Sequence, residues 1–326
     1  MLTTRFTALV GCSVPIQQAG MDWPVGNSTL AAAVANAGGL GIVGVYGLPP
    51  ERIAHILDAL RAETTGVCGA NFIMRFVDPA QVRASIEAAA ARVKVVDFFY
   101  SEPDPTLVDL VHAQGALACW QVGSRAEAVA AVEAGCDFIV AQGIEAGGHV
   151  RGRIGLLALL GEVLDAVSVP VLAAGGIGSG RAMAAALAAG ADGVRVGTRF
   201  VAAEEAGAHP TYVAALIAAD ARDTVYTEAF SFNWPNAPHR ALRSSVEAAQ
   251  AFQGDIVGEW VSVDTGEREP IHRFACLTVD RHVTGAIEAM PHWAGESVDG
   301  VKHVQPAADI VQELAGEAEA LLRRWT

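Results

Sequence analysis

The stretch Val169-Pro-Val-Leu-Ala-Ala-Gly-Gly-Ile-Gly-Ser-Gly180 continues as Arg181-Ala-Met-Ala-Ala-Ala-Leu-Ala-Ala-Gly190 and, two residues later, as Gly193-Val-Arg-Val-Gly-Thr-Arg-Phe200. It consists of a short apolar run, a glycine-rich turn, an alanine-rich helical stretch and a second apolar run. This order is typical of a βα module, in which a helix connects two parallel strands. Ala189-Gly190 predicts the end of the helix, because glycine readily adopts the left-handed conformation found there.

The same alternation recurs from residue 14 to residue 200, with further helix stops at Ala37-Gly38, Gln114-Gly115 and Ala134-Gly135. Strands are predicted at 14–16, 40–45, 67–73, 95–100, 117–122, 138–141, 169–173 and 193–196. Eight strands in series predict an α/β fold, the (β/α)₈ TIM barrel. The rival is an open, doubly wound sheet with a ligand at its switch point. We favour the barrel because the series shows no obvious mid-sheet crossover.

The βα rhythm ends after Phe200, where aromatic and proline-broken segments begin. We therefore predict a barrel over residues 1–215 and a smaller, mostly helical cap or substrate domain over 216–300. Residues 301–326 are expected to form a C-terminal helix that packs back on the barrel.

Composition limits the possible functions. The 326 residues include 22 Lys+Arg and 36 Asp+Glu, a net charge of −14, which argues against nucleic acids and anionic membranes as partners. The N-terminus lacks the pattern of a signal peptide and no apolar run is long enough to span a membrane, so a cytoplasmic location is expected. Five scattered cysteines and the histidine spacing provide no metal site. The oligomeric state is not readable from the sequence.

The glycine turn of the opening stretch could hold a phosphate group. Backbone N–H groups at Gly175, Gly176, Gly178 and Gly180 could approach an anion closely, next to a helix N-terminus, and Gly197 and Thr198 would close the other side. Strands seven and eight of a barrel are the usual place for such a group. The alternative is a tight turn that simply requires positive φ angles. A dinucleotide site is disfavoured, because the spacing is not G-x-G-x-x-G.

A second candidate site is Gln142-Gly-Ile-Glu-Ala-Gly-Gly-His149, which follows the sixth strand. His149 could exchange a proton with a substrate, because imidazole titrates near neutral pH. Gly147 and Gly148 would let a planar ligand approach closely. The alternative is a histidine that only forms hydrogen bonds within a loop or core.

Side-chain amides and small or flexible residues follow other strands as well: Gln18, Gly20 and Met21 after the first, Asn71 at the third and Gln121 at the fifth. Their amides could bind the ring edge or ribityl chain of a flavin, or could instead satisfy loop backbone. The aromatic residues Trp23, Phe232, Trp234 and Trp293 could either form the wall of an apolar pocket or belong to the core.

At these residues the sequence resembles the nitronate monooxygenase family, formerly called 2-nitropropane dioxygenases, to which the flavin-dependent enoyl-ACP reductases are related. The matching pieces include Pro15-Ile-Gln-Gln-Ala-Gly-Met21, Gly69-Ala-Asn71, Gly143-Ile-Glu-Ala-Gly-Gly-His149, Ala174-Gly-Gly-Ile-Gly-Ser-Gly180 and Gly197-Thr-Arg-Phe200. Two departures are Gln121, where some relatives carry a lysine, and Ala19, where a glycine is common.

The resemblance implies FMN, with its phosphate at Gly176, Gly178, Gly180, Gly197 and Thr198 and its ring near Gln18, Gly20, Asn71 and Gln142. It implies that His149 is catalytic and that O₂ oxidises alkyl nitronates to a carbonyl compound and nitrite. One alternative is an FMN-dependent NAD(P)H:quinone or enoyl-thioester reductase. Another is a barrel that binds a phosphate ligand without redox activity.

Overall fold

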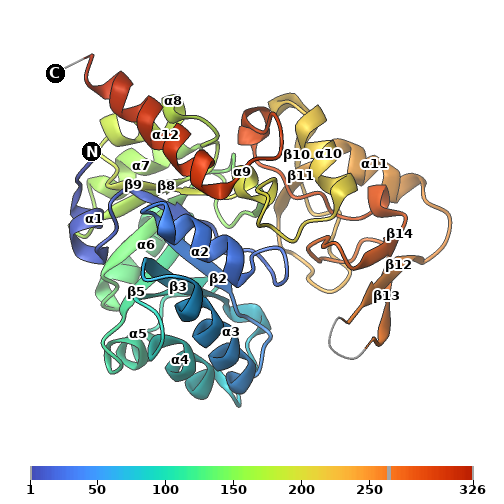
Figure 1. Ribbon diagram of the computed structural model, residues 1–326, viewed down its shortest axis with the longest axis horizontal. Helices are drawn as coiled ribbons and strands as arrows, with labels where there is room; N and C mark the ends of the chain where they lie inside the picture. Colours follow the sequence, from blue (N-terminus) through green and yellow to red (C-terminus); the bar gives the residue numbers. More distant parts are fainter. Residues whose placement is uncertain (1, 263–265, 325–326) are drawn as a thin grey trace.

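The computed structural model describes residues 2–262 and 266–324, and its main feature is a closed barrel of eight parallel strands (Figure 1). The strands are β1 (Ile16–Gln18), β2 (Leu40–Gly44), β3 (Val67–Ile73), β4 (Val95–Phe99), β5 (Leu117–Val122), β6 (Phe138–Gln142), β8 (Val171–Ala174) and β9 (Gly193–Val196). The barrel closes where Ile16 of β1 pairs with Val194 of β9. The predicted TIM barrel is confirmed, and the open doubly wound sheet is wrong.

A helix follows most strands of the barrel. These helices are α2 (Ser28–Asn36), α3 (Pro50–Glu63), α4 (Val82–Ala90), α5 (Pro105–His112), α6 (Arg125–Glu133), α7 (Leu156–Leu164) and α8 (Gly180–Ala188). Several begin at side-chain caps, such as Ser124 and Ser179, which accept hydrogen bonds from the first turn. The predicted glycine stops have positive φ angles, for example 94° at Gly38 and 106° at Gly190.

The first strand begins two residues later than expected, at Ile16 instead of residue 14. Hydrogen bonds from the backbone of Ser13 and Val14 to Gly38 hold the preceding residues outside the barrel sheet. Gln17 and Gln18 therefore belong to β1 itself and are completely buried.

The helix α1 (Arg5–Val10) closes the N-terminal end of the barrel. Phe6 and Val10 form a cluster of buried side chains with Phe138, Val140 and Leu172 from the barrel strands. Because this end is filled with apolar side chains, the opposite end, where the strands terminate, is the one available for a site.

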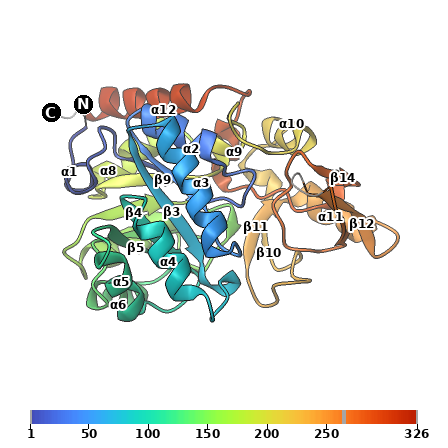
Figure 2. The same cartoon turned by 60° about the horizontal axis from the view of Figure 1, so that its bottom comes forward.

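The segment 216–300, which we name the insertion, extends away from the barrel (Figures 1 and 2). It begins in the last turn of α10 (Pro210–Ala218), which comes after α9 (Thr198–Val201). It contains η2 (Ala221–Asp223), β10 (Thr224–Thr227), β11 (His239–Leu242), α11 (Arg243–Ala251), β12 (Ile256–Val261), β13 (Arg268–His272), β14 (Val283–Gly285), η3 (Ile287–Ala289) and η4 (Glu296–Gly300).

The expectation that this segment is mostly helical is wrong. Its strands form two small antiparallel sheets, β13-β12-β14 and β10-β11-β7, and its own cluster of buried side chains includes Phe230, Val257 and Met290. Strand β7 (Gly148–His149) comes from the loop after β6, so the second sheet joins the insertion to the barrel. The alternating strand pattern of short segments is weak, which is why sequence reasoning missed it.

The final helix α12 (Ala307–Leu322) returns to the barrel and lies against α8 and α2 (Figure 2). Arg199 in α9 anchors it through an ion pair with Glu313, with Nη2 2.9 Å from Oε2. A Cβ at Gly180 would lie 2.4 Å from the Cβ of Glu317, so the glycine permits this close approach.

Candidate functional site

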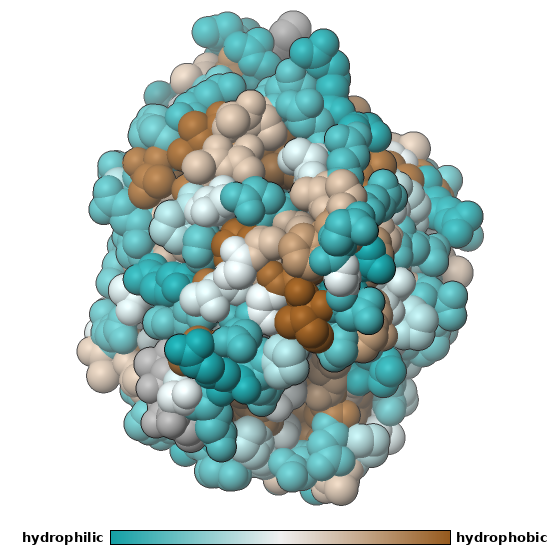
Figure 3. Space-filling view, turned by 90° about the vertical axis from the view of Figure 1, so that its right-hand side faces the viewer, coloured by the Kyte–Doolittle hydropathy of each residue, from teal (hydrophilic) through white to brown (hydrophobic). Residues whose placement is uncertain are grey.

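A cavity of about 980 Å³ opens at the carboxyl ends of the barrel strands and continues beneath the insertion. The barrel contributes backbone and amide groups, and the insertion contributes aromatic side chains. A mostly apolar cavity with a few polar groups is typical of a small-molecule site. On the outer face of the molecule, at the end formed by the insertion, hydrophobic residues gather near the centre and hydrophilic residues surround them (Figure 3).

Most of the predicted site residues line this cavity together with His149. They are Gly20, Met21, Asn71, Gln121, Gln142, Gly147, Gly148, Gly175, Gly176, Gly197 and Thr198. Three do not line it: Gln18, Gly178 and Gly180. The carboxyl ends of parallel barrel strands meet at one face, so residues predicted from six separate strands come together.

Two of the predicted amides satisfy backbone groups. The Gln18 side chain donates to the carbonyl of Ile42, 2.9 Å away, inside the barrel wall. Gln142 donates to the carbonyl of His149 at 2.9 Å and accepts from the N–H of Arg151. The loop that carries His149 is therefore held by the last residue of β6.

The glycine turn after β8 divides into two parts. Gly175 and Gly176 have φ angles of 105° and 70° and line the cavity, so both the turn and an open cradle require glycine there. Gly178 lies against the backbone of the insertion, where a Cβ would be 2.4 Å from the carbonyl oxygen of Ser297. Packing thus explains Gly178 and Gly180 without any ligand.

His149 lies in an aromatic enclosure on β7. Its ring stacks on Trp234, with centroids 3.9 Å apart and an interplanar angle of 21°, and a tilted Trp293 ring is 5.5 Å away. Its Nε2 is 3.8 Å from the Sγ of Cys276. Burial, and to a smaller extent the neighbouring His239, lowers the pKa of His149 to about 3. Burial therefore favours the neutral form of the ring, in contrast to the near-neutral titration expected from imidazole alone.

The aromatic residues Trp23, Phe232, Trp234 and Trp293 all line the cavity. Trp234 is only 4% exposed, because Phe76 and Tyr100 also pack against it. The pocket-wall interpretation holds for these four side chains, and Trp234 is also part of a packed cluster.

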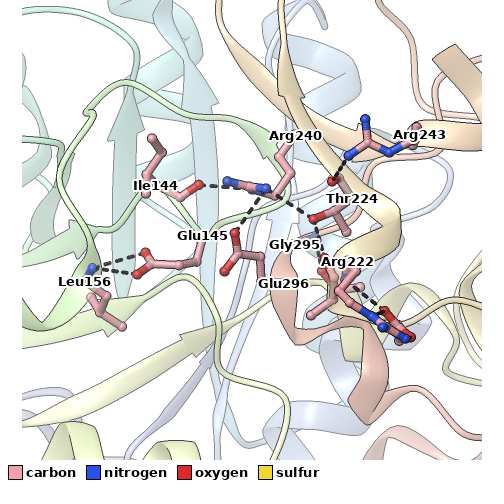
Figure 4. A network of polar contacts seen from close by, with 12 residues as sticks. Ile144, Glu145, Leu156, Arg222, Thr224, Arg240, Arg243, Gly295 and Glu296 are labelled. Atoms are coloured by element: carbon pink, nitrogen blue, oxygen red, sulfur yellow. Dashed lines mark hydrogen bonds and ion pairs between the residues drawn. The ribbon is translucent and has the colours of Figure 1, made fainter.

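A polar network fixes the loop that carries His149 to the insertion (Figure 4). Arg240 on β11 donates to the carbonyl of Ile144 at 3.1 Å and forms an ion pair with Glu296. Glu145, in the predicted motif, accepts hydrogen bonds from the N–H of Leu156 at the start of α7. Glu145 therefore orients the loop, and it is not among the described residues that line the cavity.

Sequence reasoning missed a polar wall formed by Asp22, Cys276 and Thr278, all of which line the cavity. The hydroxyl of Thr278 donates to Oδ2 of Asp22 at 2.7 Å, and Oδ1 of Asp22 is buried without a partner among the described residues. The Asn233 side chain donates a hydrogen bond to the backbone carbonyl of Cys276 and accepts one from its backbone N–H. The sequence offered one signal for this wall: Asp22 is an acidic residue directly after Met21, in the loop that follows the first strand.

Asp22 gives a testable pH dependence. Burial raises its pKa to about 6, against an opposing hydrogen bond from Thr278. The pKa in the folded state exceeds that in the unfolded state, so the free energy of unfolding should decrease as the pH rises from about 4 to about 6. Asp22→Asn should remove this decrease, which amounts to at most about 3 kcal/mol.

Urea unfolding of both proteins at pH 4 and pH 7 checks this expectation. Asp109→Asn, on the exposed face of α5, is the control and should not alter the difference between the two pH values. Equal pH dependence in Asp22→Asn and the unmodified protein would contradict it.

A second missed residue is Arg195 on β9, an arginine within the otherwise apolar run Gly193-Val-Arg-Val. It lines the cavity and is paired with Asp97 of β4, with Nη2 2.7 Å from Oδ1. Asn71 in turn donates to the other Asp97 oxygen at 2.5 Å. The floor of the cavity is therefore a buried, charged network.

Among the residues that the structure describes, no helix is long and apolar enough to cross a membrane. Nor do the described histidine, cysteine, aspartate and glutamate residues form a group of three that could hold a metal ion.

A closed barrel with a glycine cradle, amide groups and an enclosed histidine at its carboxyl face is the arrangement of a flavin-dependent oxidoreductase. The nitronate monooxygenase family model matches residues 3–317, and the chain belongs to this family. The family and its solved neighbours are flavoproteins, which implies a flavin cofactor.

Individual relatives have several activities. The chain is 33% identical over 264 residues to (3aS,4S,5R,7aS)-5-hydroxy-7a-methyl-1-oxo-octahydro-1H-indene-4-carboxyl-CoA dehydrogenase of Rhodococcus jostii, covering 79% of this chain and 70% of the relative. A probable nitronate monooxygenase of Staphylococcus aureus is 29% identical over 297 residues, covering 77% of this chain and 82% of the relative.

Two solved structures match almost the whole chain. FabK from Thermotoga maritima is 29% identical, with a TM-score of 0.81 and coverage of 100% of this chain and 99% of that one. A nitroalkane oxidase from Streptomyces ansochromogenes is 28% identical, with a TM-score of 0.78 and coverage of 99% and 100%.

Proposed function

We propose that the protein binds FMN and catalyses the oxidation of alkyl nitronates by O₂ to a carbonyl compound and nitrite. The observation that carries this proposal is that His149, stacked on Trp234 in its aromatic enclosure, lines a large cavity of a nitronate monooxygenase family member. When bound, FMN supplies the electron transfer between nitronate and O₂.

The described residues fit FMN. Gly175 and Gly176 have positive φ angles and leave open a cradle in which a side chain would be strained, and Thr198 lies opposite in the same cavity. These residues and Gly197 would hold the phosphate. Gly20, Asn71 and Gln121 would lie along the ring, and a Cβ at Gly20 would collide with Asn71 at 2.4 Å.

The protein's own groups would bind and shield the nitronate. A neutral imidazole keeps one N–H, so His149 can donate a hydrogen bond to a nitronate oxygen. A pKa of about 3 makes the same ring a weak base, which favours a preformed nitronate over a neutral nitroalkane as the substrate. Trp234 and Trp293 exclude water from this side of the cavity, which strengthens the hydrogen bond.

Anaerobic visible spectra of the purified protein test the proposal. One sample receives an alkyl nitronate and another receives NADH or NADPH. Bleaching of the flavin absorption by the nitronate, without a response to the nicotinamides, is the expected result. A protein that binds no added FMN, or whose flavin does not respond to nitronates, would contradict it.

A second candidate is an FMN-dependent reductase of enoyl thioesters or quinones. The whole-chain similarity to FabK and the relative that acts on a CoA thioester favour it, as does a cavity large enough for a bulky acceptor beside a flavin. Rapid bleaching by NADH or NADPH alone, followed by reoxidation with an enoyl thioester or quinone, would support this candidate instead.

A further inference from the structure

Arg195 forms a buried cation at the floor of the cavity. Its guanidinium group contacts three barrel strands: it is ion-paired with Asp97 on β4, it donates to the side-chain oxygen of Gln121 on β5, and its Nε lies 3.4 Å from Oε1 of Gln17 on β1. The side chains of Arg195 and Asp97 are 4% and 0% exposed.

The two members of the Arg195–Asp97 ion pair differ in their access to the cavity. Arg195 and Gln121 line the cavity, whereas Asp97 is not among the described residues that line it. Asp97 pairs with the guanidinium group and also accepts a hydrogen bond from Asn71. A ligand on the cavity floor therefore meets the positive member of the pair first.

Stability alone does not account for this pair. Removing two charges from water costs several kcal/mol each, and apolar side chains of similar volume often replace a buried ion pair without loss. Charges held at fixed positions in a poorly hydrated site act strongly on a ligand, because little solvent screens them. The arrangement suits a ligand that gains negative charge during the reaction.

We propose that Arg195 supplies the positive charge that stabilises the reduced, anionic form of the bound flavin, and this inference rests on the proposed binding of FMN. When a flavin ring accepts two electrons and one proton from a reductant, it gains one negative charge. A cation near the ring shifts that equilibrium toward the reduced form. Because Gln121 contacts Arg195 directly, a cation placed on β5 at position 121 would occupy the same part of the floor.

Sulfite is the probe. Its electron pair forms a bond from sulfur to the flavin ring, and the resulting adduct also places negative charge on the ring. Sulfite binding at saturating FMN therefore measures the same stabilisation without any substrate turnover. The reduction potential of the flavin, measured by titration with dithionite, provides a second readout.

The main variant is Asp97→Asn with Arg195→Gln, which removes both charges and leaves no unpaired ion. We expect its dissociation constant for sulfite to rise at least tenfold and its flavin potential to fall, where a tenfold change in the two-electron equilibrium corresponds to about 30 mV. Gln121→Lys with Arg195→Gln moves the cation to β5 and should restore sulfite affinity to within about threefold.

The matched control removes another ion pair at the opposite end of β9. Arg5 and Asp192 are joined with Nη2 2.6 Å from Oδ2, next to the closed end of the barrel. Arg5→Gln with Asp192→Asn should leave sulfite affinity unchanged. If the main variant does not fold, the single variant Asp97→Asn tests the inference instead. It leaves the Arg195 cation without its counter-ion and should therefore tighten sulfite binding at least threefold.

Two results would overturn the inference. One is a main variant, or an Asp97→Asn variant, that holds FMN with unchanged sulfite affinity and potential. The other is a purified protein that binds no FMN. Such a protein would show no flavin spectrum at all, and the proposed function would fail together with the inference. A protein that binds sulfite with the expected dependence on Arg195, but whose flavin is not bleached by nitronates, would support the role of Arg195 and refute only the proposed substrate.

Discussion

Replacement of His149 by alanine should lower the rate of nitronate oxidation by about 100-fold or more, while FMN stays bound. The ring is the polar group that the aromatic enclosure of Trp234 and Trp293 holds at the cavity surface. Its removal takes away a hydrogen-bond donor in a site from which water is excluded. The phosphate cradle after β8 comes from other strands and is unaffected.

Steady-state rates at saturating nitronate, together with the flavin content of each preparation, check this prediction. His149→Gln keeps a side-chain N–H and should recover part of the lost rate. His112→Ala is the control, because that histidine pairs with Asp137 on the outside of the barrel. Full activity of His149→Ala would show that the assigned role is wrong.

Gly147→Ala should destabilise the protein by about 2–3 kcal/mol and also reduce activity. A Cβ at Gly147 would lie 2.4 Å from the backbone nitrogen of Gly295 and 2.7 Å from the carbonyl carbon of Ala294. Both contacts are with backbone atoms, so the added methyl group must move the chain of the insertion. That movement would break the hydrogen bond from the N–H of Glu296 to the carbonyl of Glu145 and displace His149.

The neighbouring Gly148 provides a matched comparison. It has a φ angle of 71° but nothing within 4 Å of an added Cβ, so Gly148→Ala should cost only the backbone strain of about 1 kcal/mol. Urea unfolding of the two variants separates the effects. The explanation from packing would be refuted by a Gly147→Ala variant as stable as Gly148→Ala.

Gly147 shows how one motif can serve several purposes. The sequence around His149 was interpreted as a loop open to a planar ligand. In the structure, of the two glycines only Gly148 has free space around an added Cβ, whereas the backbone of the insertion packs against Gly147. The Glu145 side chain accepts a hydrogen bond from the N–H of Leu156 at the start of α7. The motif therefore holds barrel, insertion and histidine in one arrangement, in addition to facing the cavity.

The barrel and the end of the barrel that carries the site were predictable from the sequence. Helix stops such as Gly38 and Gly190, caps such as Ser179 and the apolar runs between them are local signals, and each acts within a few residues of chain. Because parallel strands all point the same way, residues that follow them must meet at one face. Hence Asn71, Gln142 and Thr198 could be assigned to one cavity without a structure.

Only the tertiary structure decided what those residues contact. The pairs Arg195–Asp97 and Thr278–Asp22 join residues far apart in the chain, and no local pattern indicates them. The lowered pKa of His149 depends on burial by Trp234 and His239, both from the insertion. Desolvation and ion pairing depend on the complete packed environment of a side chain, whereas the signals for helices and turns lie among neighbours in the sequence. The local order of residues therefore determined the barrel, and the packing determined the chemistry of its site.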